Sequence, residues 1–166
     1  MKRSAYERWV VSFVENLSDY FNLSGWTILV EFSDAEDKTG TYADNNIDSS
    51  YMYSTLTFYR QSRLDFEAGK MDLLITAVVH EMVHIFIDPF QDWMHPHLSP
   101  TTTPLFMGTI ENQTQKLTLV LRKTLPKKLI PPRPHKNGKH NSTSADYKSD
   151  PAIPVQPPAD VHIPDE

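Results

Sequence analysis

The first segment of the chain shows the pattern of an amphipathic helix. Apolar side chains recur at steps of three and four between residues 6 and 21, with charged and polar residues between them. Gly25 follows, and residues 26–32 then alternate apolar and polar side chains with a period of two. The pattern therefore predicts a helix followed by a half-buried strand.

The middle of the chain is typical of short strands and turns. Residues 33–40 form a polar segment, residues 41–43 resemble a short strand, and "DNNID" at 44–48 has the composition of a turn. Residues 49–60 are rich in aromatic and β-branched side chains, which favour strands. We expect two or three further strands here, mostly antiparallel.

The helical period returns at about Asp65. Apolar residues cover much of the circumference of this second helix, which Pro89 is expected to end. Residues 105–125 predict a third helix with a more polar middle. Its expected inward stripe consists of Phe106, Ile110, Leu117, Val120 and Leu121.

The composition changes after Leu125. Nine of the 13 prolines lie in residues 126–166, and this segment contains no Phe or Trp. Such a segment has too few large apolar side chains to form a packed core. We therefore predict one α+β domain over residues 1–125 and a disordered Pro-rich tail over residues 126–166.

Charge and cysteine content limit the function classes. The formal charge of −5 argues against nucleic-acid binding, and the absence of cysteine excludes a disulfide framework, a thiolate metal site and a cysteine nucleophile. Charged residues interrupt the N-terminal apolar pattern, and no long uninterrupted apolar run is evident. We expect a cytoplasmic protein, not secreted and with no membrane partner, that is a monomer.

The second helix contains the motif with the clearest chemistry, within "TAVVHEMVHIFIDPF" at 76–90. His80 and His84 are four residues apart, so on a helix both imidazoles reach one metal ion. Glu81 follows the first histidine, where its carboxylate can act as general base toward a water molecule. This HExxH pattern is a zinc peptidase motif, although five-residue patterns also occur by chance. Burial of three ionisable groups among apolar neighbours favours the metal site.

A catalytic zinc site needs a third protein ligand. Ile87 and Phe90 occupy the positions where some HExxH families place a glycine and a further ligand. Asp88 lies roughly 12 Å along the helix from His80, too far to share its metal. The remaining candidates are His95, His97 and Glu111. A carboxylate on a second, packed helix would complete the site, which favours Glu111.

The order of strands, HExxH helix, loop and acidic helix resembles the small glutamate-type zincins, the minimal gluzincins. "IENQTQKL" at 110–117 is similar to the start of the last helix in small metallopeptidases encoded by phages and prophages. The resemblance covers about residues 5–122. It implies a zincin-like fold, His80, His84 and Glu111 as zinc ligands, Glu81 as catalytic base, and a protein or peptide substrate. Asn112 departs from the family, where a second acid is common.

Several functional questions stay open in the sequence. His95, His97 or Tyr42 could stabilise the oxyanion, and the strand with Tyr51 and Tyr53 could pair with an extended peptide or simply cover the helices. The main alternative function is a catalytically inactive metal-binding regulatory or virion-associated protein of the same fold. Two others are a SprT-like or ImmA-like zincin acting on DNA-bound or repressor proteins, and an interaction domain whose motif is accidental.

Overall fold

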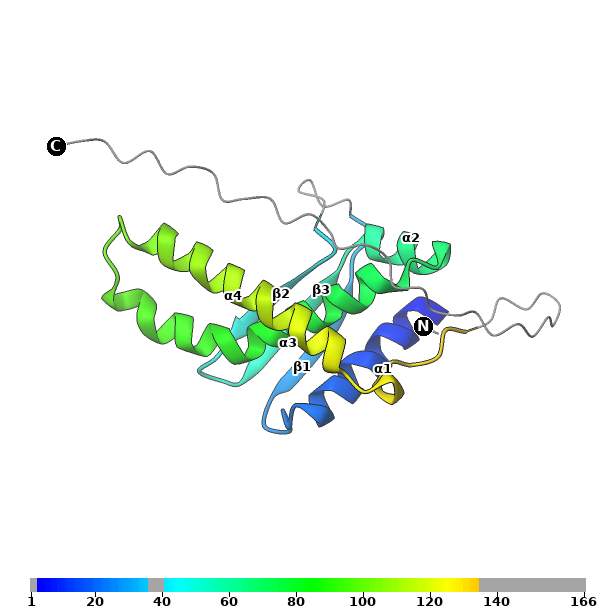
Figure 1. Cartoon of the computed structure of the whole chain (residues 1–166). Helices are drawn as coiled ribbons and strands as arrows, with labels where there is room; N and C mark the ends of the chain where they lie inside the picture. Colours follow the sequence, from blue (N-terminus) through cyan, green and yellow to red (C-terminus); the bar gives the residue numbers. More distant parts are fainter. Residues whose placement is uncertain (1–2, 36–40, 135–166) are drawn as a thin grey trace. The chain divides into compact units, whose positions relative to one another are not determined.

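The computed structural model describes residues 3–35 and 41–134. Four α-helices, three strands and two short 3-10 helices follow one another in this part of the chain (Figure 1). In chain order they are α1 (Ala5–Tyr20), β1 (Thr27–Phe32), β2 (Ala43–Asp48), β3 (Tyr53–Phe58), α2 (Arg60–Ala68), α3 (Met71–Met94), η1 (His95–His97), α4 (Thr103–Thr124) and η2 (Lys127–Leu129). The α+β class expected from the sequence is confirmed.

Helix α1 is the amphipathic helix that the sequence predicts. Ser4 and Glu7 form a capping box, which satisfies backbone N–H groups that have no partner inside the helix. Six of its apolar residues enter the core: Tyr6, Trp9, Val10, Phe13, Val14 and Leu17. This face packs on α3, so the two helices form the centre of the domain.

The sheet has the order β1-β3-β2 and is mixed. β3 pairs parallel with β1 and antiparallel with β2, so the expected mostly antiparallel sheet is wrong for one of the two pairings. Strand β2 carries the chain back across the sheet. β3 therefore starts at the same end as β1 and inserts between the two earlier strands, which gives a parallel pair without a crossover helix.

Strand β2 corrects a second expectation, because it contains the "DNNID" segment that was predicted as a turn. Asp and Asn are depleted in strands, but pairing with β3 provides hydrogen-bond partners for the backbone. Its side chains alternate. Ala43, Asn45 and Ile47 are buried or half-buried, while Asp44, Asn46 and Asp48 are exposed. β2 is also an edge strand of the three-stranded sheet.

The second predicted helix is two helices in the structure, separated by Gly69. Gly69 has a φ of 86°, and Arg133 lies where a side chain would project, so both the backbone and the space favour glycine. The later helix, α3, does not end at Pro89 but continues to Met94. Five residues follow the proline within the helix. A proline disturbs a helix through its missing N–H and its clash with the carbonyl one turn back, and neither effect involves the residues that follow it.

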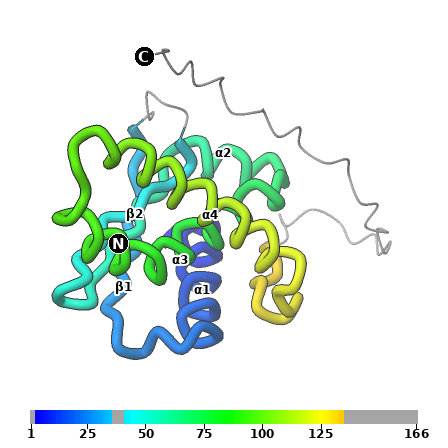
Figure 2. Tube along the Cα trace, turned by 60° about the vertical axis from the view of Figure 1, so that its left-hand side comes forward, coloured from blue at the N-terminus to red at the C-terminus, as the bar shows by residue number. Residues whose placement is uncertain are grey.

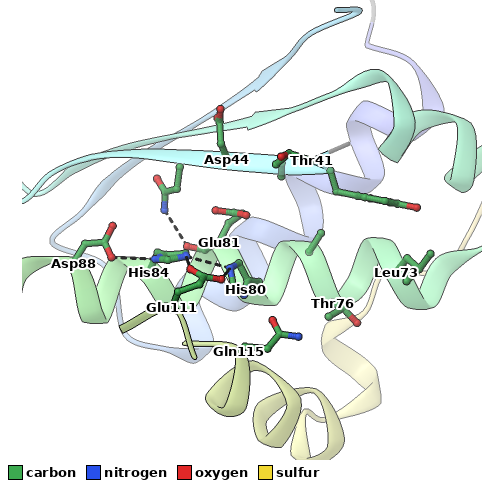
Figure 3. A pocket seen from close by; sticks show the side chains of 14 residues that line it. Thr41, Asp44, Leu73, Thr76, His80, Glu81, His84, Asp88, Glu111 and Gln115 are labelled. Atoms are coloured by element: carbon green, nitrogen blue, oxygen red, sulfur yellow. Dashed lines mark hydrogen bonds and ion pairs between the residues drawn. The ribbon is translucent and has the colours of Figure 1, made fainter. Parts of the chain in front are cut away.

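Helix α4 lies alongside α3 in both views of the chain (Figures 1 and 2). Its buried residues are Ile110, Thr114 and Thr118. The expected stripe is correct for Ile110 and wrong for Leu117 and Val120, which are exposed. The helix is rotated so that two threonines, and not the leucine and valine, face α3. This orientation also turns Glu111 and Gln115 toward α3 (Figure 3).

The domain extends past residue 125, where the sequence predicted its end. The compact unit that contains the fold runs to Pro134. Trp9 donates a side-chain hydrogen bond to Pro131 O at 2.7 Å, and Arg133 donates to Phe66 O at 2.9 Å. These bonds attach the proline-rich segment to α1 and α2. The rest of the predicted tail, residues 135–166, lies outside the described residues.

Residues 71–97, which comprise α3 and η1, are long and apolar enough to cross a membrane by length and composition alone. Such a match to one helix is weak evidence, because the core helix of a soluble protein passes the same test. The buried side of α3 packs on α1, β2 and α4.

Candidate metal centre

Three side chains from two helices converge on one point. His80 and His84 project from α3, and Glu111 projects from α4 (Figure 3). The two Nε2 atoms are 3.1 Å apart, and the Glu111 carboxylate oxygens lie 3.3 Å from His80 Nε2 and 3.6 Å from His84 Nε2. A group with this composition and spacing could hold a metal ion. The structure therefore brings together the three predicted ligands.

His84 has a carboxylate on the side away from Glu111. Its Nδ1 lies 3.0 Å from Asp88 Oδ1, one helical turn further along α3. Burial acts to lower the pKa of His84, but the hydrogen bond and charge of Asp88, with Glu81 and Glu111, outweigh burial and raise it. Asp88 is therefore outside the candidate ligand group and hydrogen-bonds one of its members. Its spacing of four residues from His84 was visible in the sequence.

His80 has neutral partners on its far side. Thr118 Oγ1 lies 3.4 Å from His80 Nδ1, and the side chain of Gln115 acts to raise the pKa of the ring. Burial lowers the pKa of His80, although the charge of Glu111 opposes this shift. The ring is therefore biased toward the neutral form that binds metals. No sequence signal indicated Thr118, because its role depends on how α4 is rotated.

Glu81 is 7% exposed, and it lines the pocket beside the histidines. Its pKa is raised to about 8, chiefly by burial; the charge of His84 opposes the rise, and the charges of Asp44, Glu111 and Asp88 contribute to it. No hydrogen bond reaches its carboxylate from the part of the chain that the structure describes. A buried acid that no described residue hydrogen-bonds is costly. A cation on the neighbouring ligands would stabilise its ionised form.

The pocket is about 480 Å³ in volume and lies between α3, α4 and β2. Tyr42, Leu73 and Ala77 also line it. Asn45 links strand to helix beside Glu81: its Nδ2 donates to Glu81 O at 2.9 Å, and Ser54 Oγ donates to Asn45 Oδ1 at 2.7 Å. This chain of hydrogen bonds holds the edge strand beside the candidate base. No sequence signal indicated Asn45, because its segment has the composition of a turn.

The other predicted candidates lie elsewhere. His95 and His97 are exposed in η1, do not line the pocket, and join no group of potential ligands among residues 3–35 and 41–134. Tyr42 does line the pocket. The strand with Tyr53 is central in the sheet, so the edge that borders the pocket belongs to β2.

Comparison with known proteins adds no assignment. No family model matches the chain, and no curated protein or solved structure matches it. The chemistry of the site must therefore be inferred from its own geometry.

Proposed function

We propose that this chain is a zinc-dependent metallopeptidase with a zincin-like domain of the minimal gluzincin type. The observation that carries the proposal is the position of Glu81. It is a buried carboxylate without a hydrogen-bond donor among the described residues, and it opens on the same pocket as His80, His84 and Glu111. A site built only to bind metal has no use for such a group.

The donor set supports zinc as the metal. Two imidazole nitrogens and one carboxylate oxygen are common zinc ligands, and tetrahedral zinc with bonds of about 2.0–2.1 Å places its ligand atoms about 3.3 Å apart. The two Nε2 atoms are 3.1 Å apart, and they lie 3.3 Å and 3.6 Å from the two different oxygens of the Glu111 carboxylate. Catalytic zinc sites use three protein ligands and keep a position open, whereas structural sites are closed by a fourth. The described residues supply three.

Each residue of the pocket then has its own role in the reaction. Zinc, when bound, would act as a Lewis acid toward the scissile carbonyl and acidify water. Glu81 accepts a proton from the attacking water and later donates it to the leaving amine. Its low exposure excludes bulk water, and Asn45 holds β2 beside it. The free edge of β2 offers backbone groups to an extended peptide, as in strand addition. Tyr42 is the candidate in the pocket for oxyanion stabilisation.

The decisive experiment compares the wild type with Glu81→Gln. The substitution keeps the size of the side chain but removes its ability to accept a proton, so we expect proteolysis to fall by about 10²–10⁴-fold. Zinc content should stay at one ion per chain, because Glu81 is not a ligand. Both proteins are incubated with a peptide library derived from a proteome, and new N-termini are quantified by mass spectrometry.

Two results would contradict the proposal. Wild-type protein without stoichiometric zinc would remove the metal site. Bound zinc with no cleavage above the Glu81→Gln background would favour the alternative, a metal-binding protein without peptidase activity. Glu67→Gln is the matched control, since Glu67 is an exposed glutamate on α2 outside the pocket.

A further inference from the structure

Thr118 occupies an unusual position for a hydroxyl side chain. It is fully buried between α4 and α3, at a place where an apolar residue would ordinarily pack, and its Oγ1 lies 3.4 Å from His80 Nδ1. Leu117 and Val120, its neighbours on the same helix, are exposed instead. The rotation of α4 thus exposes apolar side chains and buries a polar one beside a candidate metal ligand.

We propose that Thr118 is a positioning residue of the metal centre, which holds the His80 ring in the tautomer that directs the Nε2 lone pair toward His84 and Glu111. The inference rests on the metal site of the proposed function, and it concerns which residue outside the ligands prepares that site.

The assignment follows from counting protons. A threonine hydroxyl has one proton, and that of Thr118 is donated to Thr114 O at 2.8 Å. Toward His80 Nδ1 the same oxygen can therefore only accept a hydrogen bond. Nδ1 must then carry the proton, and in a neutral imidazole this leaves Nε2 with a free lone pair. Nε2 is the atom that lies 3.3 Å from Glu111.

Helix α4 thereby acts on the site twice. Glu111 supplies a ligand, and Thr118, two turns later on the same side of the helix, orients a ligand on the other helix. His84 receives the corresponding support from Asp88 on its own helix. The two histidines differ in the partner of Nδ1, which is a carboxylate for His84 and a neutral hydroxyl for His80. The hydroxyl adds no charge beside Glu81.

Thr114 provides a matched control within the same helix. It lies one turn before Thr118 and is also fully buried, but its Oγ1 has no hydrogen-bond partner among the described residues. Replacing either threonine with valine makes the same chemical change in a similar environment. Only the change at Thr118 removes a hydrogen bond to the metal centre.

The test is a zinc titration against a competing chelator, on the full chain, with wild type, Thr118→Val, Thr118→Ser, Thr118→Ala and Thr114→Val. Loss of a partner behind a metal-binding histidine typically weakens affinity about 10–100-fold. We expect zinc affinity to fall about 10-fold in Thr118→Val and Thr118→Ala, at the low end of this range, because a 3.4 Å contact is longer than a usual hydrogen bond. Thr118→Ser restores the hydroxyl and should bind zinc like the wild type, as should Thr114→Val.

Equal zinc affinity of Thr118→Val and Thr114→Val would overturn the inference and leave the proposed function intact. Failure of Thr118→Ser to restore affinity would also overturn it, because packing and not the hydroxyl would then be responsible. Wild-type protein that binds no zinc would overturn both proposals. The expected affinities without any peptidase activity would support the role of Thr118 and contradict the catalytic proposal alone. Thermal unfolding of the zinc-free variants separates a loss of folding from a loss of binding.

Discussion

Helices α3 and α4 carry the ligands of the same candidate metal centre, but they are anchored differently. α3 buries eight residues, seven of them apolar, whereas α4 buries only Ile110, Thr114 and Thr118. The side chains of both histidines are 17% exposed, and that of Glu111 is 59% exposed. The core therefore fixes the ligands of α3, while the Glu111 ligand depends on how α4 docks.

This difference in burial gives the two helices different roles in holding the ligands. A ligand pair on one buried helix is preorganised, since neither residue can move without disturbing the core. A ligand on a weakly buried helix needs other contacts to hold it. Bound metal would supply such a contact itself, because it would join the two helices.

The largest expected effect comes from removing a ligand. His84→Ala and Glu111→Ala should each weaken zinc binding by more than the roughly 100-fold upper value for residues that only support a ligand. The loss should be greater for His84→Ala, because Glu111→Ala leaves the preorganised pair of α3. Competition titration with a chromophoric chelator measures both. Normal zinc binding by Glu111→Ala would mean that the third ligand lies elsewhere, and His95 and His97 would be the next residues to replace.

Truncating a buried side chain of α3 should unfold the protein more readily than truncating one on α4. Met82 is fully buried, so Met82→Ala should lower the free energy of unfolding by about 2–5 kcal/mol. Val120 is 57% exposed, and Val120→Ala should change the free energy of unfolding by no more than about 0.5 kcal/mol. Urea unfolding of zinc-free protein measures the contrast. Similar losses in both variants would show that α4 is as firmly anchored as α3.

Removing the metal should loosen α4 more than α3. A ligand present at 100 times its Kd stabilises a protein by about 2.7 kcal/mol, and this stabilisation disappears when the metal is chelated. Amide hydrogen exchange with and without a chelator should show the greater gain of exchange in residues 103–124. Glu111→Gln, which lacks the ionised ligand, should respond much less to the chelator. A uniform change in both helices of the wild type would contradict unequal anchoring.

A smaller effect than the loss of a ligand is expected at Asp88. Asp88→Asn keeps the size of the side chain but removes the charge beside His84 Nδ1, and zinc affinity should fall about 10–100-fold. Asp92→Asn is the control, because Asp92 lies one turn further and bonds Ser49 instead. Equal affinities of these two variants would remove Asp88 from the site. A loss greater than that of Thr118→Val would confirm that the carboxylate supports its histidine more strongly than the hydroxyl does.

Much of this fold was accessible to sequence reasoning where local pattern and burial agree. The inward face of α1 and the alternation of β1 follow from their periodicity, and the structure confirms both. Reasoning failed where tertiary contacts override composition. Strand β2 exists because β3 pairs with it, and its Asn45 is held by Ser54 and Glu81. Such local exceptions are expected near functional sites.

In the candidate site, too, some residues could be predicted from the sequence and others could not. The spacing of His80, Glu81 and His84 places three groups on one helix, so their proximity needs no knowledge of the rest of the chain. Glu111 was favoured among three candidates, but its approach to the histidines required the packing of α4 on α3. Asp88 was close enough in sequence to be recognised, whereas Thr118 was not.

The sequence by itself determined the elements whose signals are local: the amphipathic helix, the HExxH spacing and the acidic, cysteine-free composition that leaves only His, Asp and Glu as metal ligands. Only the tertiary structure decided the rotation of α4, the pairing of β2 and the partners of the two histidines. The physical reason is that periodicity reports which face of an element is apolar. Here α4 buries two threonines, which a hydrophobic pattern cannot indicate. Thr118 contacts His80 on α3 and bonds Thr114 O within its own helix, so a polar contact between the helices stands where apolar contact is usual.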